Sequence, residues 1–290
     1  MNPLRFPDLR AAHPPPLPSW WRQTCPLALA VLAGGCMLYP VMSHAETIAT
    51  DRPDFVESAE VVGAGHVQIE AGFSSERDRG GRAHGVRTRM RTTPTLMRMG
   101  LNDTVELRIE TDGRALAGSQ DTATGLTRSD SGWSDASFGA KWRQREGDEE
   151  RGTAAIAWLA HVDVDSGSAA FRSQGATPSL RMVAEWALPH QWSIGVMPGL
   201  MLDRNPQRER FVGGIFAVTV GKAWTPEWRT YLEVAGRRLA RQRDGGSLVT
   251  LDVGAAYVVT RAVQIDFSAA RGLTRETPRM QWGVGISVRF

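Results

Sequence analysis

The chain has 290 residues, of which 42% are hydrophobic and 22% are charged, and its formal net charge is +3. This length suits either one large barrel or two soluble domains, so it leaves the fold class open. The only long apolar run, Pro26 to Met42, is interrupted by Gly34, Gly35 and Pro40, and no later stretch could span a bilayer as a helix.

The apolar run is typical of a secretory signal. Arg22 precedes it, and Ser43-His44-Ala45 supplies small residues at the two positions that a signal peptidase inspects. We therefore expect residues 1–45 to be a signal peptide and Glu46 to begin the mature chain. A buried helix of a soluble domain and lipoprotein processing before Cys36 are the alternatives.

Removal of this segment would change the chemistry available to the protein. Both cysteines, Cys25 and Cys36, would be lost, which leaves no thiol, disulfide or cysteine metal site. The mature chain would keep 31 basic and 30 acidic residues, because three arginines and one aspartate lie in the removed part. Such a balance indicates no uniformly basic face and no nucleic-acid partner.

The mature sequence alternates between apolar and polar residues in segments of roughly 9 to 14 residues, as strands with two different faces do. In the last segment the even positions from Met280 to Phe290 are all apolar, whereas the odd positions from Arg279 to Arg289 are small, polar or charged. Alternation of this kind fits both a soluble sandwich and a transmembrane barrel.

Twelve such segments follow one another along the chain. They are His66 to Ser74, Val86 to Leu101, Thr104 to Gly113, Gly132 to Arg145, Gly152 to Val164, Pro178 to Leu188, Gln191 to Asp203, Arg210 to Lys222, Pro226 to Leu239, Ser247 to Val259, Ala262 to Leu273 and Pro278 to Phe290.

The connections between these segments favour the barrel. Long connections (Ser75 to Gly85, Arg114 to Ser131 and Asp165 to Thr177) alternate with mostly tight ones, and the segment Arg114 to Ser131 is expected to be a mobile loop. Short turns on one rim and longer loops on the other are typical of an outer-membrane barrel. We therefore predict an all-β, transmembrane, antiparallel up-and-down barrel of about twelve strands over residues 66–290, preceded by a periplasmic N-terminal segment, residues 46–65.

The aromatic residues agree with this topology, since many lie within a few residues of the tight turns or the C-terminus, as an interfacial girdle requires. They are Trp142, Trp186, Trp192, Trp224, Trp228, Tyr257 and Phe290.

The second segment fits least well. Arg87, Arg89 and Arg91 share parity with Met97 and Met99, and these two groups suit different environments. Pro94 lies between them and cannot donate a ladder hydrogen bond, so a bulge there is expected to reset the parity.

Charge on the lipid face of a barrel is costly, so the alternating charges are predicted to point into the lumen. The predicted lumen and substrate-path residues are Glu70, Glu106, Arg108, Glu110, Asp112, Arg181, Glu185, Arg229, Glu233, Asp252 and Asp266. They could line an aqueous path that selects small solutes, or they could pair across the lumen and fill it.

Catalysis has little support in the sequence. His161 and Asp163 share a strand and a face, but no serine stands in a recognisable nucleophile setting near them, so an esterase remains a minor alternative. No histidine pair has the spacing of metal ligands, and no glycine-rich loop precedes a helix. We expect a protein that is not an enzyme and holds no metal or cofactor.

A family resemblance adds to this reading. The segment Thr50 to Ser58, together with Gly63, Gly65 to Glu70 and Gly72-Phe73, resembles the opening of a family of outer-membrane transporters that is named for the meta-cleavage pathway of phenol degradation. The stretch Thr93 to Leu96 and the residues Arg98, Gly100-Leu101 and Glu106 to Arg108 continue the similarity, and the terminal Phe290 suits it. The resemblance implies a transporter-like barrel.

From the residues and the resemblance together we expect an outer-membrane pore or transporter for small solutes, such as aromatic or acidic catabolites, in a Gram-negative bacterium. The alternative is a non-transporting structural or sensory barrel whose lumen is filled by ion pairs. Expected partners are outer-membrane lipid, the solute, and a barrel-assembly machinery that reads Phe290 as a signal.

The short polar segment before the barrel has a predicted role of its own. Its motif consists of Asp51, Arg52, Pro53, Asp54, Phe55 and Glu57. We expect this segment to tuck under or into the periplasmic mouth, with Arg52 paired to lumen carboxylates, and a disordered leader is the alternative.

Overall fold

The computed structural model describes residues 47–77, 86–121, 123–173, 175–205 and 207–290. The predicted signal peptide, residues 1–45, lies outside these ranges. Within them no helix is long and apolar enough to cross a membrane.

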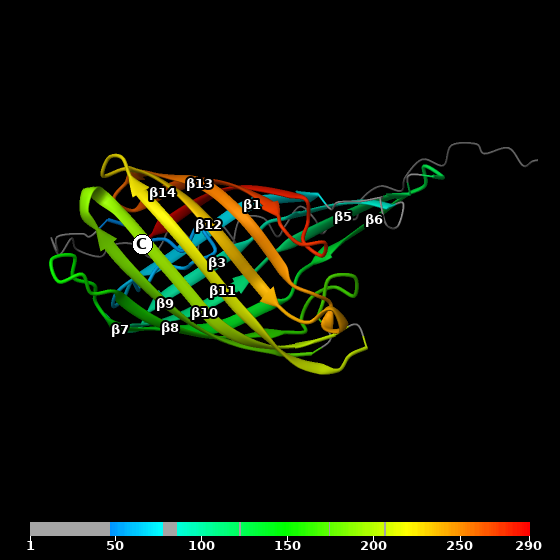
Figure 1. The fold of residues 1–290 in the computed structure, drawn as a ribbon, viewed down its shortest axis with the longest axis horizontal. Coiled ribbons are helices and arrows are strands. Elements are labelled where there is room, and N and C mark those ends of the chain that lie inside the picture. Colours follow the sequence, from blue (N-terminus) through cyan, green and yellow to red (C-terminus); the bar gives the residue numbers. More distant parts are fainter. Residues whose placement is uncertain (1–46, 78–85, 122, 174, 206) are drawn as a thin grey trace, which may run out of the picture. The chain divides into compact units, whose positions relative to one another are not determined.

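The described chain forms one antiparallel sheet that closes on itself (Figure 1). The strands are β1 (Val67–Arg77), β2 (Val86–Thr92), β3 (Thr95–Gly100), β4 (Val105–Thr111), β5 (Arg114–Asp121), β6 (Thr127–Trp133), β7 (Ala136–Arg145), β8 (Ala155–Val164), β9 (Thr177–Leu188), β10 (Trp192–Arg204), β11 (Arg210–Ala223), β12 (Trp228–Leu239), β13 (Leu248–Thr260), β14 (Val263–Gly272) and β15 (Met280–Arg289). Strand β1 pairs with β15 over its whole length, from Gln68↔Arg289 to Arg77↔Met280, and this pairing closes the barrel.

The barrel has twelve strands, as the sequence predicted. Three of them are each interrupted once, so that β2 with β3, β4 with β5, and β6 with β7 form three long strands. The tight connections, residues 101–104, 189–191, 224–227 and 261–262, all lie on one rim, which we call the turn rim. The opposite rim, which we call the loop rim, carries the connections 165–176, 205–209, 240–247 and 273–279.

The side chains are arranged inside out compared with a soluble protein. Large apolar residues are exposed on the outer wall, among them Ile69, Leu107, Phe138, Leu180, Phe216, Leu232, Val253, Ile265, Val284 and Ile286. Charged residues are buried inside, including Glu70, Arg98, Glu106, Arg108, Lys141 and Glu233. An exposed apolar belt around a polar interior is what a closed barrel needs in order to sit in a bilayer.

Aromatic residues lie at the turn rim as predicted, and several are exposed. Trp228 and Tyr257 pack with their ring centroids 6.2 Å apart, and the Lys222 ammonium lies 5.3 Å from the ring centre of Trp192 and 5.8 Å from that of Trp224. Rings of this kind, with one apolar side and a polar tip, suit the boundary between lipid and water.

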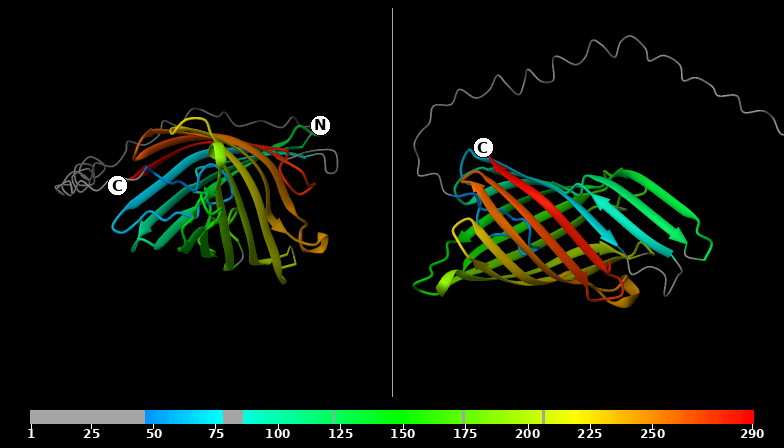
Figure 2. Two further views of the ribbon diagram at one scale, coloured as in Figure 1. Left: turned by 60° about the vertical axis from the view of Figure 1, so that its left-hand side comes forward. Right: turned by 90° about the horizontal axis from the view of Figure 1, so that it is seen from above.

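The predicted loop from Arg114 to Ser131 is wrong, because most of it is the hairpin of β5 and β6. With β2 this hairpin forms an extension that projects from the loop rim beyond the other strands (Figure 2). Most side chains of the extension are exposed or half-buried on either face, so its strands need no apolar alternation. Their sequence therefore resembles that of a polar loop.

The predicted bulge at Pro94 is also wrong. Residues on both sides of it keep one register with β1, since Ser74 pairs with Thr92 and Ala71 pairs with Thr95. The extra residue lies on the facing strand, between Thr111 and Arg114, because the β3–β4 and β2–β5 registers differ there by one position.

A glycine makes this bulge possible. Gly113 has a φ of +67°, and a Cβ at this position would collide with the backbone oxygen of Thr93. L-residues with side chains rarely adopt this conformation, whereas glycine does so at little cost.

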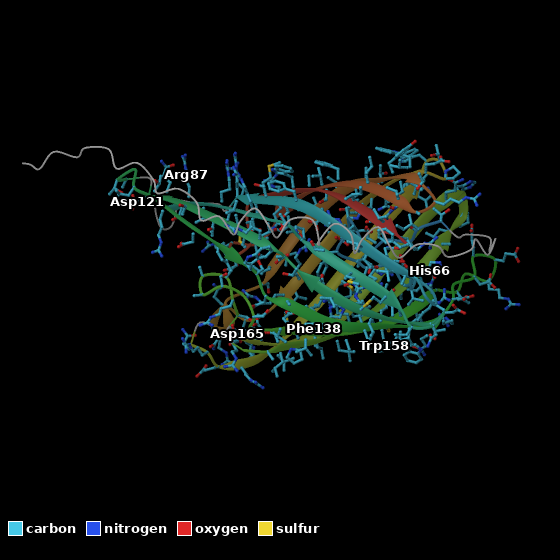
Figure 3. The ribbon with its side chains drawn as sticks, turned by 180° about the vertical axis from the view of Figure 1, so that it is seen from behind. His66, Arg87, Asp121, Phe138, Trp158 and Asp165 are labelled. Carbon is cyan, nitrogen blue, oxygen red and sulfur yellow. The ribbon has the colours of Figure 1, made fainter. Side chains whose placement is uncertain are left out.

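Arg87, Arg89 and Arg91 therefore share the outer face with Met97 and Met99. The arginines belong to the extension, and Figure 3 shows Arg87 and Asp121 at the end opposite His66. The part of this face that carries the methionines lies on the barrel wall and the part that carries the arginines lies on the extension. The conflict in parity is therefore resolved without a bulge at Pro94.

Candidate functional site

The N-terminal segment, residues 47–65, lies inside the barrel. It enters at the turn rim, where the Ile48 N–H donates to the backbone oxygen of Arg261 (2.9 Å), and it leaves at the same rim, where the Gly65 N–H donates to Gly100 (3.2 Å). Between these points it reaches up to the middle of the barrel as a loop. We call its upper part, Arg52 to Glu57, the tip.

Glutamates of the wall hold the backbone of this segment. The Glu70 carboxylate accepts the N–H groups of Asp51 (3.1 Å) and Arg52 (3.1 Å), and the Glu233 carboxylate accepts those of Phe55 (2.9 Å) and Val56 (2.7 Å). Such hydrogen bonds to an ionised acceptor are stronger than neutral ones.

Two further glutamates hold the returning part of the segment. Glu185 accepts the Ala59 N–H (2.5 Å), and Glu106 accepts the Val62 N–H (3.0 Å). Together with Glu70 and Glu233, these carboxylates replace the strand partners that the backbone of the segment lacks.

Asp51 lies at the centre of a buried ionic cluster. Its carboxylate is 2.5 Å from Arg108 Nη1, 2.8 Å from Lys141 Nζ and 3.5 Å from Arg98 Nε. Burial alone would raise the pKa of Asp51, but these three cations outweigh burial and hold the pKa well below its usual value. The carboxylate thus stays ionised inside the barrel.

The other acidic residues of the segment pair with the wall in the same way. Glu57 contacts Arg108 (2.8 Å) and Arg181 (2.7 Å), and Asp54 contacts Arg229 (3.2 Å). With each charge paired, the interior bears little of the penalty that unpaired buried charges carry.

Arg52 occupies a notch in the wall between two glycines. Its Nη2 and Nε atoms lie 3.0 and 3.2 Å from the two carboxylate oxygens of Asp266. Gly72 and Gly285 are direct partners on β1 and β15, and an added Cβ on either would overlap the guanidinium. The predicted pairing of Arg52 with a lumen carboxylate is therefore present, at Asp266.

The segment also has an apolar anchor. Val56 and Ala59 pack into a buried cluster formed by Ala155, Ala157, Leu159, Val183, Met197, Ala217 and Ala235 on strands β8 to β12. This patch interrupts the polar interior, so burial of Val56 adds a hydrophobic contribution to the ionic contacts.

Phe55 marks the top of the tip. Its ring lies 4.5 Å from the Arg237 guanidinium carbon, and Arg237 in turn pairs with Asp252 at 3.2 Å. The arrangement combines a cation–π contact with an ion pair.

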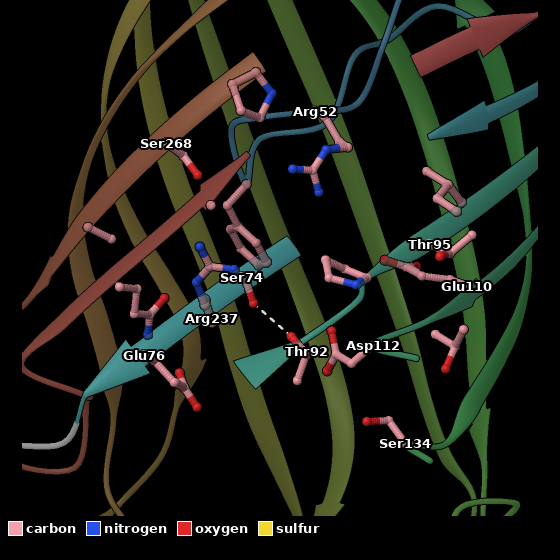
Figure 4. A pocket seen from close by; sticks show the side chains of 18 of the residues that line it. Arg52, Ser74, Glu76, Thr92, Thr95, Glu110, Asp112, Ser134, Arg237 and Ser268 are labelled. Atoms are coloured by element: carbon pink, nitrogen blue, oxygen red, sulfur yellow. Dashed lines mark hydrogen bonds between the residues drawn. The ribbon is translucent and has the colours of Figure 1, made fainter. Parts of the chain in front are cut away.

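Above the tip lies a cavity of about 830 Å³ that extends toward the loop rim (Figure 4). Asp51 to Phe55 form part of its lining, and Glu276 to Pro278 of the loop rim form another part. Its lining contains eleven carboxylates and four arginines. Lys141, Arg229 and Arg98 lie outside the lining and pair with Asp51, Asp54 and Glu70. The carboxylates that remain still outnumber the arginines, so the cavity favours cations over anions.

Two predicted residues face this cavity without binding the segment. Asp112 is exposed, and its carboxylate has no hydrogen bond or ion pair with any described residue, while Glu110 lies 3.4 Å from His161 Nδ1. His161 itself is buried in the wall beside Gly139, and Asp163 lines the cavity.

Most of the predicted lumen residues contact the segment instead of lining an open path. The residues in contact are Glu70, Glu106, Arg108, Arg181, Glu185, Arg229, Glu233 and Asp266. Asp252 reaches it only through Arg237, and Glu110 and Asp112 remain in the cavity.

Arg98 is missing from the lumen residues that the sequence predicted. This fully buried residue contacts Glu70 (3.1 Å) and Glu106 (2.9 Å), and it donates to the backbone oxygens of Ala49 and Glu60. Its position between Met97 and Met99 was the available signal, since the residue between two outward side chains of a strand points inward.

The chain is similar to known proteins both in sequence and in structure. A family model described as "Putative MetA-pathway of phenol degradation" matches residues 50–290. An outer-membrane channel from Pseudomonas putida F1 has a similar structure, with a TM-score of 0.56 and 14% identity over 80% of this chain and 98% of that chain. No curated protein matches the chain.

Two other barrels are similar at lower scores. The β domain of the Bordetella autotransporter BrkA has a TM-score of 0.48 at 12% identity, covering 77% of this chain and 98% of that chain. The toluene transporter TbuX of Ralstonia pickettii has a TM-score of 0.42 at 10% identity, covering 78% and 89%. The Pseudomonas structure supports the fold, which is that of an outer-membrane barrel.

Proposed function

The chain belongs to the family described as "Putative MetA-pathway of phenol degradation", and its barrel holds a cavity above an internal segment. We propose that it is an outer-membrane channel for small solutes and that its own N-terminal segment closes the channel. The observation that carries this proposal is the tip, which forms part of the cavity lining in the middle of the lumen. The turn rim would face the periplasm, and the extension would face the outside.

The charges of the cavity narrow the class of solute. With eleven carboxylates against four arginines, an acidic catabolite would meet repulsion, whereas a neutral or cationic solute would not. Phe55, Phe171 and Tyr231 add ring surface to the lining, which suits solutes with an apolar part.

The wall residues bind the N-terminal segment in the closed state and face the solute in the open state. Glu70, Glu185 and Glu233 release the backbone N–H groups when the segment withdraws, and they then become part of the lumen surface. Glu110 and Asp112 face the solute in either state.

A signal peptide at residues 1–45, recognition of Phe290 during barrel assembly and contact with outer-membrane lipid belong to the same proposal. Phe290 is exposed at the end of the closing strand, where its backbone pairs with Val67. The function is not enzymatic.

The second candidate is a barrel that transports nothing. It is favoured by the ion pairs that join the segment to the wall below the cavity, because these would fill the lumen permanently.

Swelling of proteoliposomes separates the two candidates. Purified protein is reconstituted and the vesicles are placed in an isosmotic solution of arabinose, a small neutral solute. We expect swelling with the full mature chain, and faster swelling with Asp51→Asn, which weakens the hold on the segment. Vesicles that stay unswollen with both proteins would favour the filled barrel.

A further inference from the structure

Gly72, Gly285 and Asp266 form a row across three neighbouring strands. Gly72 on β1 pairs directly with Gly285 on β15, and Gly285 pairs directly with Asp266 on β14. The row therefore presents two positions without side chains and then a carboxylate, all on the inner face of the barrel.

The shape of this notch matches a planar guanidinium. The Arg52 side chain lies over both glycines, where any Cβ would displace it, and two of its nitrogens meet the two oxygens of Asp266 at 3.0 and 3.2 Å. A bidentate contact of this kind suits the fork of a guanidinium, whereas an ammonium group offers only a point charge.

The notch is also within reach of the cavity. Arg52 lines the cavity and its side chain is 18% exposed, whereas the Asp266 side chain behind it is fully buried. The excess of carboxylates in the cavity lining raises the local concentration of cations in front of the notch.

We propose that the row of Gly72, Gly285 and Asp266 is a guanidinium-binding site of the barrel wall. Arg52 occupies it within the chain, and the guanidinium group of a small solute takes it from the cavity when the Arg52 side chain leaves. The second part rests on the proposed function, since a solute reaches the notch through a channel that opens.

The site is emptied for testing by Arg52→Ala, which keeps the notch and removes its occupant. The folded protein in detergent is titrated with methylguanidinium chloride and, as a matched cation without the planar fork, with methylammonium chloride. We expect the variant to bind methylguanidinium at least tenfold more tightly than methylammonium. The unaltered protein should bind methylguanidinium at least tenfold more weakly than the variant, because Arg52 competes.

Two further variants in the Arg52→Ala background locate the binding. Gly285→Ala places a methyl group where the guanidinium lies and within 2.6 Å of Asp266 Oδ2, while Asp266 keeps its charge, so binding should fall at least tenfold. Gly283→Ala lies two residues away on the same strand, where a Cβ would meet the Ser268 hydroxyl at 3.2 Å, the Phe73 backbone oxygen at 3.4 Å and Ser74 Cβ at 3.8 Å, and no atom of Arg52, so binding should be retained.

Equal binding of the two cations, or binding that survives Gly285→Ala, would overturn the proposal. The channel itself is read separately, by conductance of the same proteins in planar bilayers. If methylguanidinium binds selectively but none of the proteins conducts, the proposed channel function is wrong and the guanidinium site is still supported.

Discussion

Glu233 shows how a single wall residue can hold the internal segment. Its carboxylate accepts two successive backbone N–H groups, those of Phe55 and Val56, while the side chain remains almost fully buried. Contacts to the backbone depend little on the sequence of the segment, so the identity of Glu233 matters more than that of the residues it holds.

Glu233→Gln should loosen the tip. The change removes the charge and one of the two oxygens, and a hydrogen bond to a charged group contributes about 1.5 to 3 kcal/mol. Since about 1.4 kcal/mol is a factor of ten, we expect the open state of the tip to become at least about tenfold more populated. A cysteine placed by Ser58→Cys in the chain without residues 1–45, which has no other cysteine, reports this as a faster reaction with a maleimide.

Glu276→Gln provides the matched control for that experiment, because Glu276 bonds to Gln242 at the loop rim and not to the segment. Its labelling rate should equal that of the parent protein. Equal rates for the Glu233 and Glu276 variants would show that Glu233 does not hold the tip.

The alternation of residues predicted which carboxylates point inward, but not what they meet there. The inward orientation of Glu106 and Glu185 is predicted by alternation alone, since every second side chain of a strand points to the same face. Their partners lie 44 and 126 residues away along the chain, on a segment without periodicity. No local pattern specifies such a contact, and the same holds for the notch between Gly72 and Gly285.

At the scale of the strands, β2 and β3 divide one continuous face between two surroundings. Met97 lies beside Ile69 and Ile109 in an exposed apolar row, whereas Arg89 lies on the extension with the same parity. The border between lipid and water therefore crosses this strand near its interruption at residues 93 and 94.

Because of this border, substitutions at two positions on the same face should change the stability of the barrel by different amounts. Met97→Arg should destabilise the barrel by about 2 to 4 kcal/mol, because an arginine would face the hydrocarbon. Arg89→Leu should change stability by less than about 0.5 kcal/mol, as expected for a solvent-exposed surface site. Urea unfolding in lipid vesicles measures both, and similar effects of the two substitutions would place the border elsewhere.

Elements with an apolar face could be predicted well, and elements without one could not. Strands such as β15 alternate strictly because lipid lies on one side and the lumen on the other. The hairpin of β5 and β6 has water around it, so its backbone pairing left no apolar signal in the sequence.

At the scale of the whole molecule, the internal segment divides the charges of the lumen. Arg98, Arg108 and Lys141 are buried against Asp51, whereas Glu110 and Asp112 remain accessible from the cavity. The cavity is therefore acidic although the charge of the whole chain is nearly balanced, and the composition alone could not predict this.

The barrel should survive removal of the segment, because its wall charges also pair with one another. Arg98 contacts Glu70 and Glu106 directly, and Arg108 contacts Glu106 at 2.9 Å. A variant without residues 46–58 is therefore expected to fold, with a slower mobility on gels after heating as the check that it has done so.

Single-channel conductance of this variant in planar bilayers, compared with that of the full mature chain, tests the central claim most directly. If the segment closes the channel, its removal should raise the conductance several-fold and reduce the fraction of time that the channel is closed. A folded variant with the conductance and closed fraction of the full chain would contradict the claim.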